Sequence, residues 1–433
     1  TNFGAGSEVA VIASEQLWNM DTSNYNSINA GLNKLQQNNA STGQTTNQYT
    51  ITYPLYSAAD NGKGFGLLNR FTNTPSSPQY EVKATKSSTY SVNGEAKILA
   101  LACKSQTLLT FSSKYVIAST TAVTTSSTSL QNDTQAAQTF SLPESKTVLV
   151  IYQANNVHGD AMPLGGMQNA IYVDGTDYAK SWDGPFDTTY CTRNTVFWIG
   201  TLGSGSHTIK GRFARIGSSG TATVSNRVLL IYILSGDAYR YLDDSTTVTT
   251  QSTTLIDDLY ASFTFTPPGS CKALILYNIA NSGASEDGFG KKAAIRVGTT
   301  DYSQAEKSPG SYDGPSSIFT LWALQLSASS TTVKGRWAKH PGEAKDSTIH
   351  RRQLGVLMFA NDTLLDTVSS DTLVSTTSSS LVNDTQAKIQ RTTTDTRELL
   401  AVAMGTKRHM TQSSQYGECY GIKVDTNERA NSR

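Results

Sequence analysis

The stretch Ser129-Leu130-Gln131-Asn132-Asp133-Thr134-Gln135-Ala136 decides the fold, because the chain contains it more than once. A shorter copy occurs as Thr254-Leu255-Ile256-Asp257-Asp258, and a fuller one as Ser380-Leu381-Val382-Asn383-Asp384-Thr385-Gln386-Ala387. Leu130 and Leu255 are 125 positions apart. A long segment of sequence is therefore repeated.

Two later stretches keep almost the same spacing. Ile171-Tyr172-Val173-Asp174-Gly175 returns as Ile295-Arg296-Val297-Gly298-Thr299, 124 positions on, and in part as Ile422-Lys423-Val424-Asp425. Thr208-Ile209-Lys210-Gly211-Arg212-Phe213-Ala214 returns 124 positions on as Thr332-Val333-Lys334-Gly335-Arg336-Trp337-Ala338. A register held over this length indicates duplicated domains, and the period is far above that of solenoid repeats, so each copy should bury its own core, like beads on a string.

Short runs rich in Val, Ile, Thr and aromatic residues alternate with Gly, Pro, Asn and Asp in both copies. Such spacing predicts a mostly β fold of tandem antiparallel β-sandwiches, of jelly-roll type with about eight strands each. The predicted domains are an N-terminal strand and helix at 1–40, a small β region at 41–118, sandwich repeats at 119–240 and 241–365, and a partial third repeat at 366–433. The missing half of the third repeat is expected either to lie beyond the given sequence or to be supplied by another polypeptide.

The region before the repeats predicts one strand and one helix. Residues 9–13 form a short apolar strand run, and Tyr25, Ile28, Leu32 and Leu35 recur at spacings of three and four, as on one stripe of a helix. This helix either packs on its own domain or joins subunits, since the same spacing fits two heptads. Residues 41–118 match none of the later copies closely and are treated as a separate region.

The charge balance of 35 basic and 34 acidic residues gives no electrostatic footprint for nucleic acid. No run of 18 apolar residues occurs, so no membrane insertion is expected. Cys103, Cys191, Cys271 and Cys419 do not fall at matching repeat positions, which predicts free, mostly buried thiols and no cysteine metal site.

An Asp-Gly-Pro loop recurs in both copies, each time after a tyrosine. Its exposed rings could stack on a sugar while the aspartate accepts hydroxyl hydrogen bonds, or the segment could be a tight turn whose aromatic residue covers the edge of the sandwich. The candidate ligand or receptor residues are Tyr178, Trp182, Asp183, Tyr302, Tyr312 and Asp313.

Two charged motifs have mainly structural interpretations. The Lys-Gly-Arg motif at 210–212 and 334–336 could bind phosphate or a carboxylate, or lie on a solvated face of a strand. The acidic pairs Asp243-Asp244 and Asp257-Asp258 are expected in solvated turns. The sequence contains no catalytic motif and no metal-ligand spacing, so neither an enzyme, a cofactor nor a metal site is expected.

The N-terminal segment 11–33, with Glu15-Gln16-Leu17-Trp18-Asn19-Met20-Asp21, resembles the start of tailed-bacteriophage fibre and other appendage proteins. The repeats opening with Leu381-Val382-Asn383-Asp384-Thr385-Gln386-Ala387 resemble modules of virion surface proteins. The resemblance implies an oligomeric, often trimeric, fibre that is anchored to a virion by its N-terminus, with other virion proteins as partners and a host-surface glycan as a further candidate. It supplies no receptor site.

Three functions follow as hypotheses. The first is a non-enzymatic virion protein whose sandwiches act as spacers or contact the host. The second is an extracellular filament or adhesin subunit of a cell, assembled by strand exchange. The third is an array of carbohydrate-binding modules.

Overall fold

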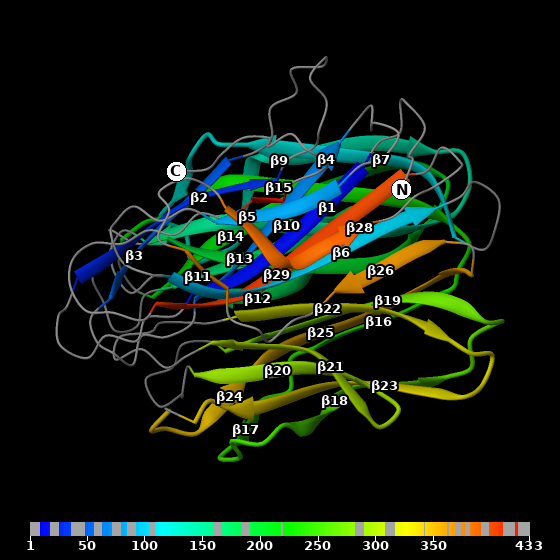
Figure 1. The fold of residues 1–433 in the computed structure, drawn as a ribbon. Coiled ribbons are helices and arrows are strands. Elements are labelled where there is room, and N and C mark those ends of the chain that lie inside the picture. Colours follow the sequence, from blue (N-terminus) through cyan, green and yellow to red (C-terminus); the bar gives the residue numbers. More distant parts are fainter. Residues whose placement is uncertain are drawn as a thin grey trace. The chain divides into compact units, whose positions relative to one another are not determined.

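All the regular secondary structure described in this computed structural model is β-strand (Figure 1). The structure describes the backbone of every strand given below and, with side chains, residues 109, 112–156, 166–182, 194–217, 220–281, 290–306, 317–341, 343–361, 363 and 367. The chain divides into two compact units, residues 106–361 and residues 1–105 together with 362–433. No helix in the described part of the chain is long and apolar enough to cross a membrane.

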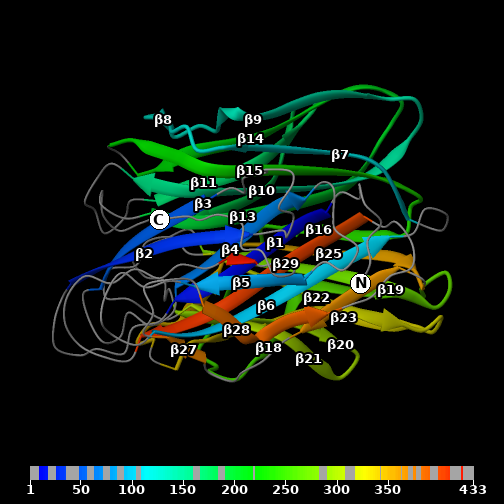
Figure 2. The ribbon, with the colours of Figure 1, turned by 45° about the horizontal axis from the view of Figure 1, so that its top comes forward.

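The first repeat forms two antiparallel sheets, with its strands drawn in cyan to green in Figure 2. One sheet has the order β13-β10-β15-β7, with β8 also paired to β15, and the other has the order β12-β11-β14-β9. The strands are β7 (Thr110–Ser119), β8 (Val123–Thr125), β9 (Gln131–Leu142), β10 (Lys146–His158), β11 (Gly166–Val173), β12 (Thr176–Asp183), β13 (Cys191–Leu202), β14 (Gly205–Ile216) and β15 (Ala222–Ser235).

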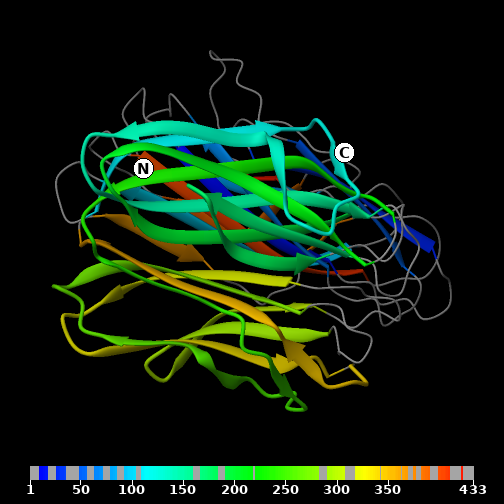
Figure 3. The same cartoon turned by 180° about the vertical axis from the view of Figure 1, so that it is seen from behind.

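The second repeat has the same arrangement, seen from behind in Figure 3. Its sheets have the orders β16-β25-β19-β22 and β18-β23-β20-β21, and β17 pairs with β24. The strands are β16 (Tyr239–Asp244), β17 (Val248–Thr250), β18 (Ile256–Phe265), β19 (Cys271–Ala280), β20 (Lys291–Val297), β21 (Thr300–Lys307), β22 (Ser317–Leu326), β23 (Thr331–Lys339), β24 (Ser347–Ile349) and β25 (Arg351–Ala360).

Both repeats have the strand order of a jelly roll. If the eight main strands of each repeat are numbered along the chain, one sheet reads 1-8-3-6 and the other 2-7-4-5 in both copies. Each repeat has its own apolar core, and the first core takes residues from both sheets, such as Phe140 and Ile209 on one side and Val150 and Ile231 on the other. The prediction of a mostly β fold built from antiparallel sheets is therefore confirmed.

Alternation along the strands explains this packing. In β9, Phe140 and Leu142 are buried, whereas the alternate residues Thr139 and Ser141 are exposed. The central strand β10 is apolar on both faces: Val148 and Val150 belong to the core, and Leu149 and Ile151 are buried outside it. Strands of this kind belong to sheets that are covered on both sides.

Each copy buries its own core, as expected, and the two sandwiches also contact each other. The rings of Phe197 and Phe319 have centroids 6.0 Å apart. Gly355 lies so close to the first sandwich that an added Cβ would stand 2.7 Å from Cδ1 of Ile199. The side-chain amide of Gln353 donates to the carbonyl of Lys180 at 3.1 Å. On the first sandwich these contacts come from β12 and β13, which are edge strands of its two sheets, and on the second sandwich they come from β22 and β25.

The other unit contains strands from both ends of the chain. Figure 1 shows β1, β29 and β6 side by side in one sheet of order β1-β4-β29-β6-β26, to which β27 is added through β6. Smaller sheets join β28 to β5, and β3 to β2 and β30. The strands are β1 (Val9–Leu17), β2 (Asn26–Leu35), β3 (Gln48–Leu55), β4 (Lys63–Phe71), β5 (Gln79–Ala84), β6 (Val92–Cys103), β26 (Leu364–Val368), β27 (Val374–Thr376), β28 (Val382–Gln390), β29 (Glu398–His409) and β30 (Gly421–Ile422).

The predicted N-terminal helix is wrong. Ile28, Leu32 and Leu35 lie in the strand β2, which pairs antiparallel with β3, and Tyr25 lies outside the described residues. The segment 26–33 contains three asparagines, a serine and a glycine, all poor helix formers, so apolar spacing alone could not stabilise a helix. The strand predicted at 9–13 is confirmed and extends to Leu17 as β1.

Candidate functional site

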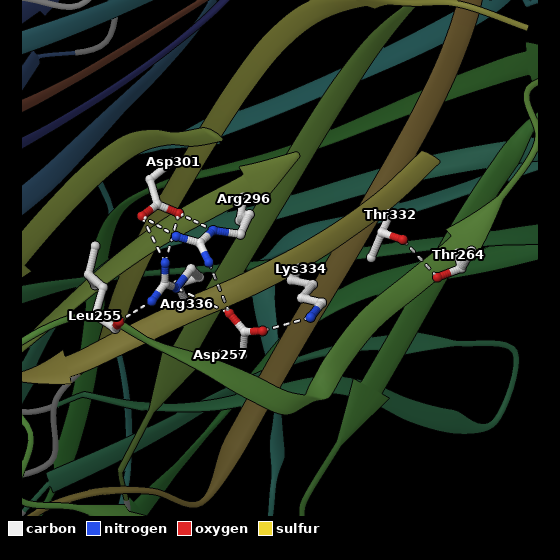
Figure 4. Close-up of polar contacts among 8 residues, drawn as sticks. All are labelled: Leu255, Asp257, Thr264, Arg296, Asp301, Thr332, Lys334 and Arg336. Carbon is white, nitrogen blue, oxygen red and sulfur yellow. Dashed lines mark hydrogen bonds and ion pairs between the residues drawn. The ribbon is translucent and has the colours of Figure 1, made fainter. Parts of the chain in front are cut away.

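The Lys-Gly-Arg motif of the second repeat lies in a charged cluster on the sheet formed by β18, β23, β20 and β21 (Figure 4). Nη1 of Arg336 donates to both carboxylate oxygens of Asp301, at 2.9 and 3.3 Å, and its Nη2 donates to the carbonyl of Leu255. Arg296 binds the same carboxylate of Asp301 through Nε at 2.7 Å. Arg336 thereby links β23 to β21 and to Leu255, the residue before β18.

A second carboxylate completes this cluster. Nζ of Lys334 lies 2.6 Å from Oδ2 of Asp257, and Arg296 and Arg336 lie within 3.6 Å of the other oxygen (Figure 4). Three cations thus share two carboxylates. Each cation has an anionic partner, and the side chains of Arg296 and Lys334 keep 26% and 32% of their surface exposed. Such exposed pairs contribute little to stability.

The first repeat keeps only part of this arrangement. Arg212 binds Asp177 at 2.9 Å and the carbonyl of Leu130, as Arg336 binds its equivalents. Tyr172 takes the place of Arg296, and the cations of Lys210 and Arg212 lie 5.4 and 5.5 Å from its ring centroid. The Arg-Asp-carbonyl contact therefore belongs to the fold of both copies, whereas the extra cation belongs to the second copy alone.

An open depression borders the charged cluster in the second repeat. It has a volume of about 560 Å³ and is lined by Val297, Gly298, Leu324, Gln325 and Lys334 among others. Its walls offer hydroxyl, amide and backbone groups with one ammonium group. These groups can contact a polar ligand, but Lys334 is already paired with Asp257.

The tyrosines of the predicted ligand loops pack against tryptophans of their own sandwiches. The ring centroid of Tyr178 lies 5.3 Å from that of Trp198, and Tyr302 stacks on Trp322 at 5.4 Å. Trp182 is half-buried on β12. Asp183 ends β12, but its side chain lies outside the described residues, as do Tyr312 and Asp313 entirely. Of the six residues, the structure therefore describes the side chains of Tyr178, Trp182 and Tyr302 alone, and the ligand loop stays a prediction.

Each sandwich has a buried Asp-Arg-Tyr triad that sequence reasoning missed. In the first, Nε of Arg227 lies 2.6 Å from Oδ2 of Asp133, and the hydroxyl of Tyr152 donates to the same oxygen at 2.9 Å. The other oxygen, Oδ1, accepts from the backbone N–H of Gln135. All three side chains are fully buried.

The second triad repeats these contacts. Nε of Arg352 lies 2.8 Å from Oδ2 of Asp258, and the hydroxyl of Tyr277 donates to that oxygen at 2.9 Å. The expectation that Asp257-Asp258 lies in a solvated turn is wrong for Asp258, which is buried inside strand β18, and Asp244 is held by Arg352. Asp, Tyr and Arg each recur at a spacing of 125 positions, the signal by which the sequence could have identified the triad.

Burial raises the pKa of the Asp133 and Asp258 carboxyl groups above their usual value, although the paired arginines and the tyrosine hydroxyls act to lower it. The pKa of Tyr152 and of Tyr277 is raised well above the usual value, first by burial and then by the adjacent carboxylate. These side chains have almost no exposed surface, and their contacts link strands of the same sandwich. Cys271 is a free, buried thiol as predicted, and burial raises its pKa. Across the described residues, no three His, Cys, Asp or Glu side chains are placed to hold a metal ion.

No protein-family model and no curated protein matches the chain. Among solved structures, the chain is distantly similar to PNGF-II, with 12% identity and a TM-score of 0.26 over 57% of this chain and 66% of that one. It is similar to the STIV MCP with 10% identity and a TM-score of 0.21, over 58% of this chain and 97% of that one. It is similar to the tandem CBM51 modules of a family 98 glycoside hydrolase from Streptococcus pneumoniae with 11% identity and a TM-score of 0.16, over 57% of this chain and 88% of that one. The chain thus spans just under two thirds of PNGF-II. At TM-scores this low they identify no family and no function.

Proposed function

We propose that the protein is a non-enzymatic structural protein of a virion, a fibre or appendage subunit whose jelly-roll modules act as rigid spacers or contact a host surface. The observation that carries this proposal is the duplicated Asp-Arg-Tyr triad. The aspartate, arginine and tyrosine of this triad recur in both repeats and are buried inside the sandwiches, where their contacts hold strands together.

The surface chemistry supports the same proposal. Hydroxyl ladders cross the sheet faces in both repeats, for example between Thr139 and Thr208 and between Thr264 and Thr332, each pair at 3.0 Å. With the near-zero net charge of the chain, such a surface is suited to packing beside copies of itself, because it carries no strong like-charge repulsion.

A homotrimer is the expected assembly, and the mass of the purified full chain in solution tests it. We expect a closed species of three times the 46.5 kDa subunit mass that does not grow as the protein concentration rises. An antibody raised against the chain should label particles in electron micrographs of the source culture. A monomer at every concentration, or label on cell-surface filaments without particles, contradicts the proposal.

The carbohydrate-binding alternative is tested by a separate measurement. Trp182→Ala combined with Tyr312→Ala removes the aromatic residue that precedes each Asp-Gly-Pro segment. If the wild-type chain binds glycans on an array and the double variant does not, the modules bind carbohydrate through these loops. Unchanged binding excludes the loops, and absence of wild-type binding leaves spacing or protein contact as the role of the modules.

A further inference from the structure

We propose that the two ends of the chain are complementary halves of one jelly roll. Residues 362–433 supply its first strands, and residues 1–105 supply its last ones. The C-terminal half is then a strand-accepting surface whose partner is the N-terminal half of the same polypeptide. This inference does not depend on whether the protein belongs to a virion.

In this split unit, residues 1–105 together with 362–433, the parallel pairings of β1 with β29 and of β2 with β30 have no counterpart in the second sandwich. Four antiparallel pairings, however, match pairings of that sandwich. There, β25 pairs with β16 and β19, β24 pairs with β17, and β23 pairs with β18. In the split unit, β6 pairs with β26, β29 and β27, and β5 pairs with β28. Strand β6 thus takes the place of β24 and β25, and β5 takes that of β23.

An irregularity in the pairing is repeated as well. In the second sandwich the register of β18 on β23 shifts between Asp257 and Ser262. In the split unit the register of β28 on β5 shifts between Asn383 and Lys388, which are the same positions 126 residues later. A β-bulge is a specific local feature, so its return at equivalent positions marks the same kind of strand pair.

Pairing and sequence also agree on the alignment of β6. Lys272 lies opposite Phe359 in the second sandwich. The residue 126 positions after Lys272 is Glu398, which lies opposite Cys103. Cys103 therefore corresponds to Phe359, at a spacing of 256 positions. At the same spacing, Thr107-Leu108-Leu109 corresponds to Thr363-Leu364-Leu365. Two independent observations therefore place residues 92–109 as the last strand of a repeat and its continuation.

The physical reason for the closure is the strand edge. The strands β26, β28 and β29 in the C-terminal half have backbone N–H and C=O groups that need partners, and an unpaired edge recruits a complementary strand. The N-terminal half supplies a strand of matching register and apolar sequence, Ile98-Leu99-Ala100-Leu101-Ala102. Tethering both halves in one chain raises their effective concentration, which favours closure within the chain over exchange between chains.

A single substitution tests the closure in the full chain. Glu398→Cys introduces a thiol directly opposite the native Cys103, at a Cα separation that a disulfide can bridge. Under mild oxidation we expect a disulfide within one chain, seen as faster migration on a non-reducing gel and as a cross-linked peptide pair by mass spectrometry. Its yield should not change when the protein is diluted.

Three controls keep this result specific. Ala360→Cys, opposite the native Cys271, is the matched positive control in the second sandwich. Leu399→Cys lies opposite Ala102, one position out of register, and should not cross-link to Cys103. Glu398→Cys in a Cys103→Ser background should lose the disulfide.

Each other outcome overturns the proposal. Disulfides between chains, with a yield that rises with protein concentration, would show that a second copy supplies the last strands. Equal cross-linking of Glu398→Cys and Leu399→Cys would contradict the register. If Ala360→Cys cross-links and Glu398→Cys does not, the two ends are not paired.

Discussion

Truncation of Arg352 to alanine should destabilise the second sandwich by about 3–5 kcal/mol, because it leaves the buried carboxylate of Asp258 without its cation. Arg352 has no exposed side-chain surface; it forms an ion pair with Asp258 and donates to Asp244 and to the carbonyl of Thr246. Typical domains are stable by only about 5–15 kcal/mol, so this loss should shift a urea unfolding curve far toward lower urea.

The matched substitution in the first sandwich is Arg227→Ala, since Arg227 contacts Asp133 in the same way. The control is Arg296→Ala, which removes an exposed ion pair and should cost about 0–1 kcal/mol. The reasoning is refuted if Arg352→Ala costs no more than Arg296→Ala, because the buried pair would then carry no more energy than a surface pair.

The pH dependence gives a second test of the same triad. The pKa of Asp258 in the folded state is raised above its usual 3.8. Protonation of this carboxyl group therefore stabilises the folded state fully below pH 3.8, and this stabilisation is lost as the pH rises through the folded-state pKa. Arg352 acts to lower that pKa. Removing the arginine therefore raises the pKa further, and the loss of stability extends to higher pH.

The measured difference between wild type and Arg352→Ala should accordingly shrink as the pH is lowered from neutral toward 4. The double variant Arg352→Ala with Asp258→Asn has no carboxyl group at this position, so its stability relative to wild type should lack this trend. A difference that grows at low pH would contradict the raised pKa.

The other predictions concern close packing and the split unit. Gly335→Ala should cost about 1–3 kcal/mol in urea unfolding, because its Cβ would lie 2.3 Å from the ring of Tyr277, whereas Gly269→Ala, with open space around it, should change stability by less than about 0.5 kcal/mol. Equal effects of the two substitutions would contradict the close approach. The unit formed by residues 1–105 and 362–433 should unfold at a lower temperature than the two sandwiches in calorimetry. At the positions that correspond to Tyr277 and Arg352 of the second triad, this unit has Ala403 and Ala96, so it lacks the buried triad. A single transition for the whole chain would contradict this prediction.

The strands of both sandwiches could be predicted because the chain repeats itself. Alternation in segments such as 134–140 and continuous apolar runs such as 148–152 define half-buried and fully buried strands, and the second copy repeats both patterns. The helix prediction failed where the only signal was a spacing of apolar residues in a segment of poor helix formers. A single periodicity, without propensity, does not decide between helix and strand.

The triads could not be predicted from local sequence. Asp257 and Asp258 are neighbours in the chain, yet one is half-buried and the other is fully buried, because successive residues of a strand face opposite sides. An unpaired aspartate is costly to bury, so the local sequence favours a solvated turn. The arginine that makes burial possible comes from the last strand of the same repeat, and only the folded sheet brings the two together.

Comparison of the two sandwiches separates residues that serve the fold from residues free to differ. The triads, the Arg-Asp-carbonyl contacts and the Tyr-Trp pairs occur in both copies and therefore answer a need that both folds share. The edge strand β18 departs from its counterpart: Leu259 and Tyr260 are 83% and 44% exposed, where the first repeat has Thr134 and Gln135. The ring of Tyr260 has its centroid 5.4 Å from the guanidinium carbon of Arg352. The exposed side chain of Leu259, by contrast, is of the kind that costs solubility on an edge strand. A role that the second sandwich does not share with the first should therefore be sought along this edge, beside the extra cation of Arg296, and not in the aromatic pairs common to both.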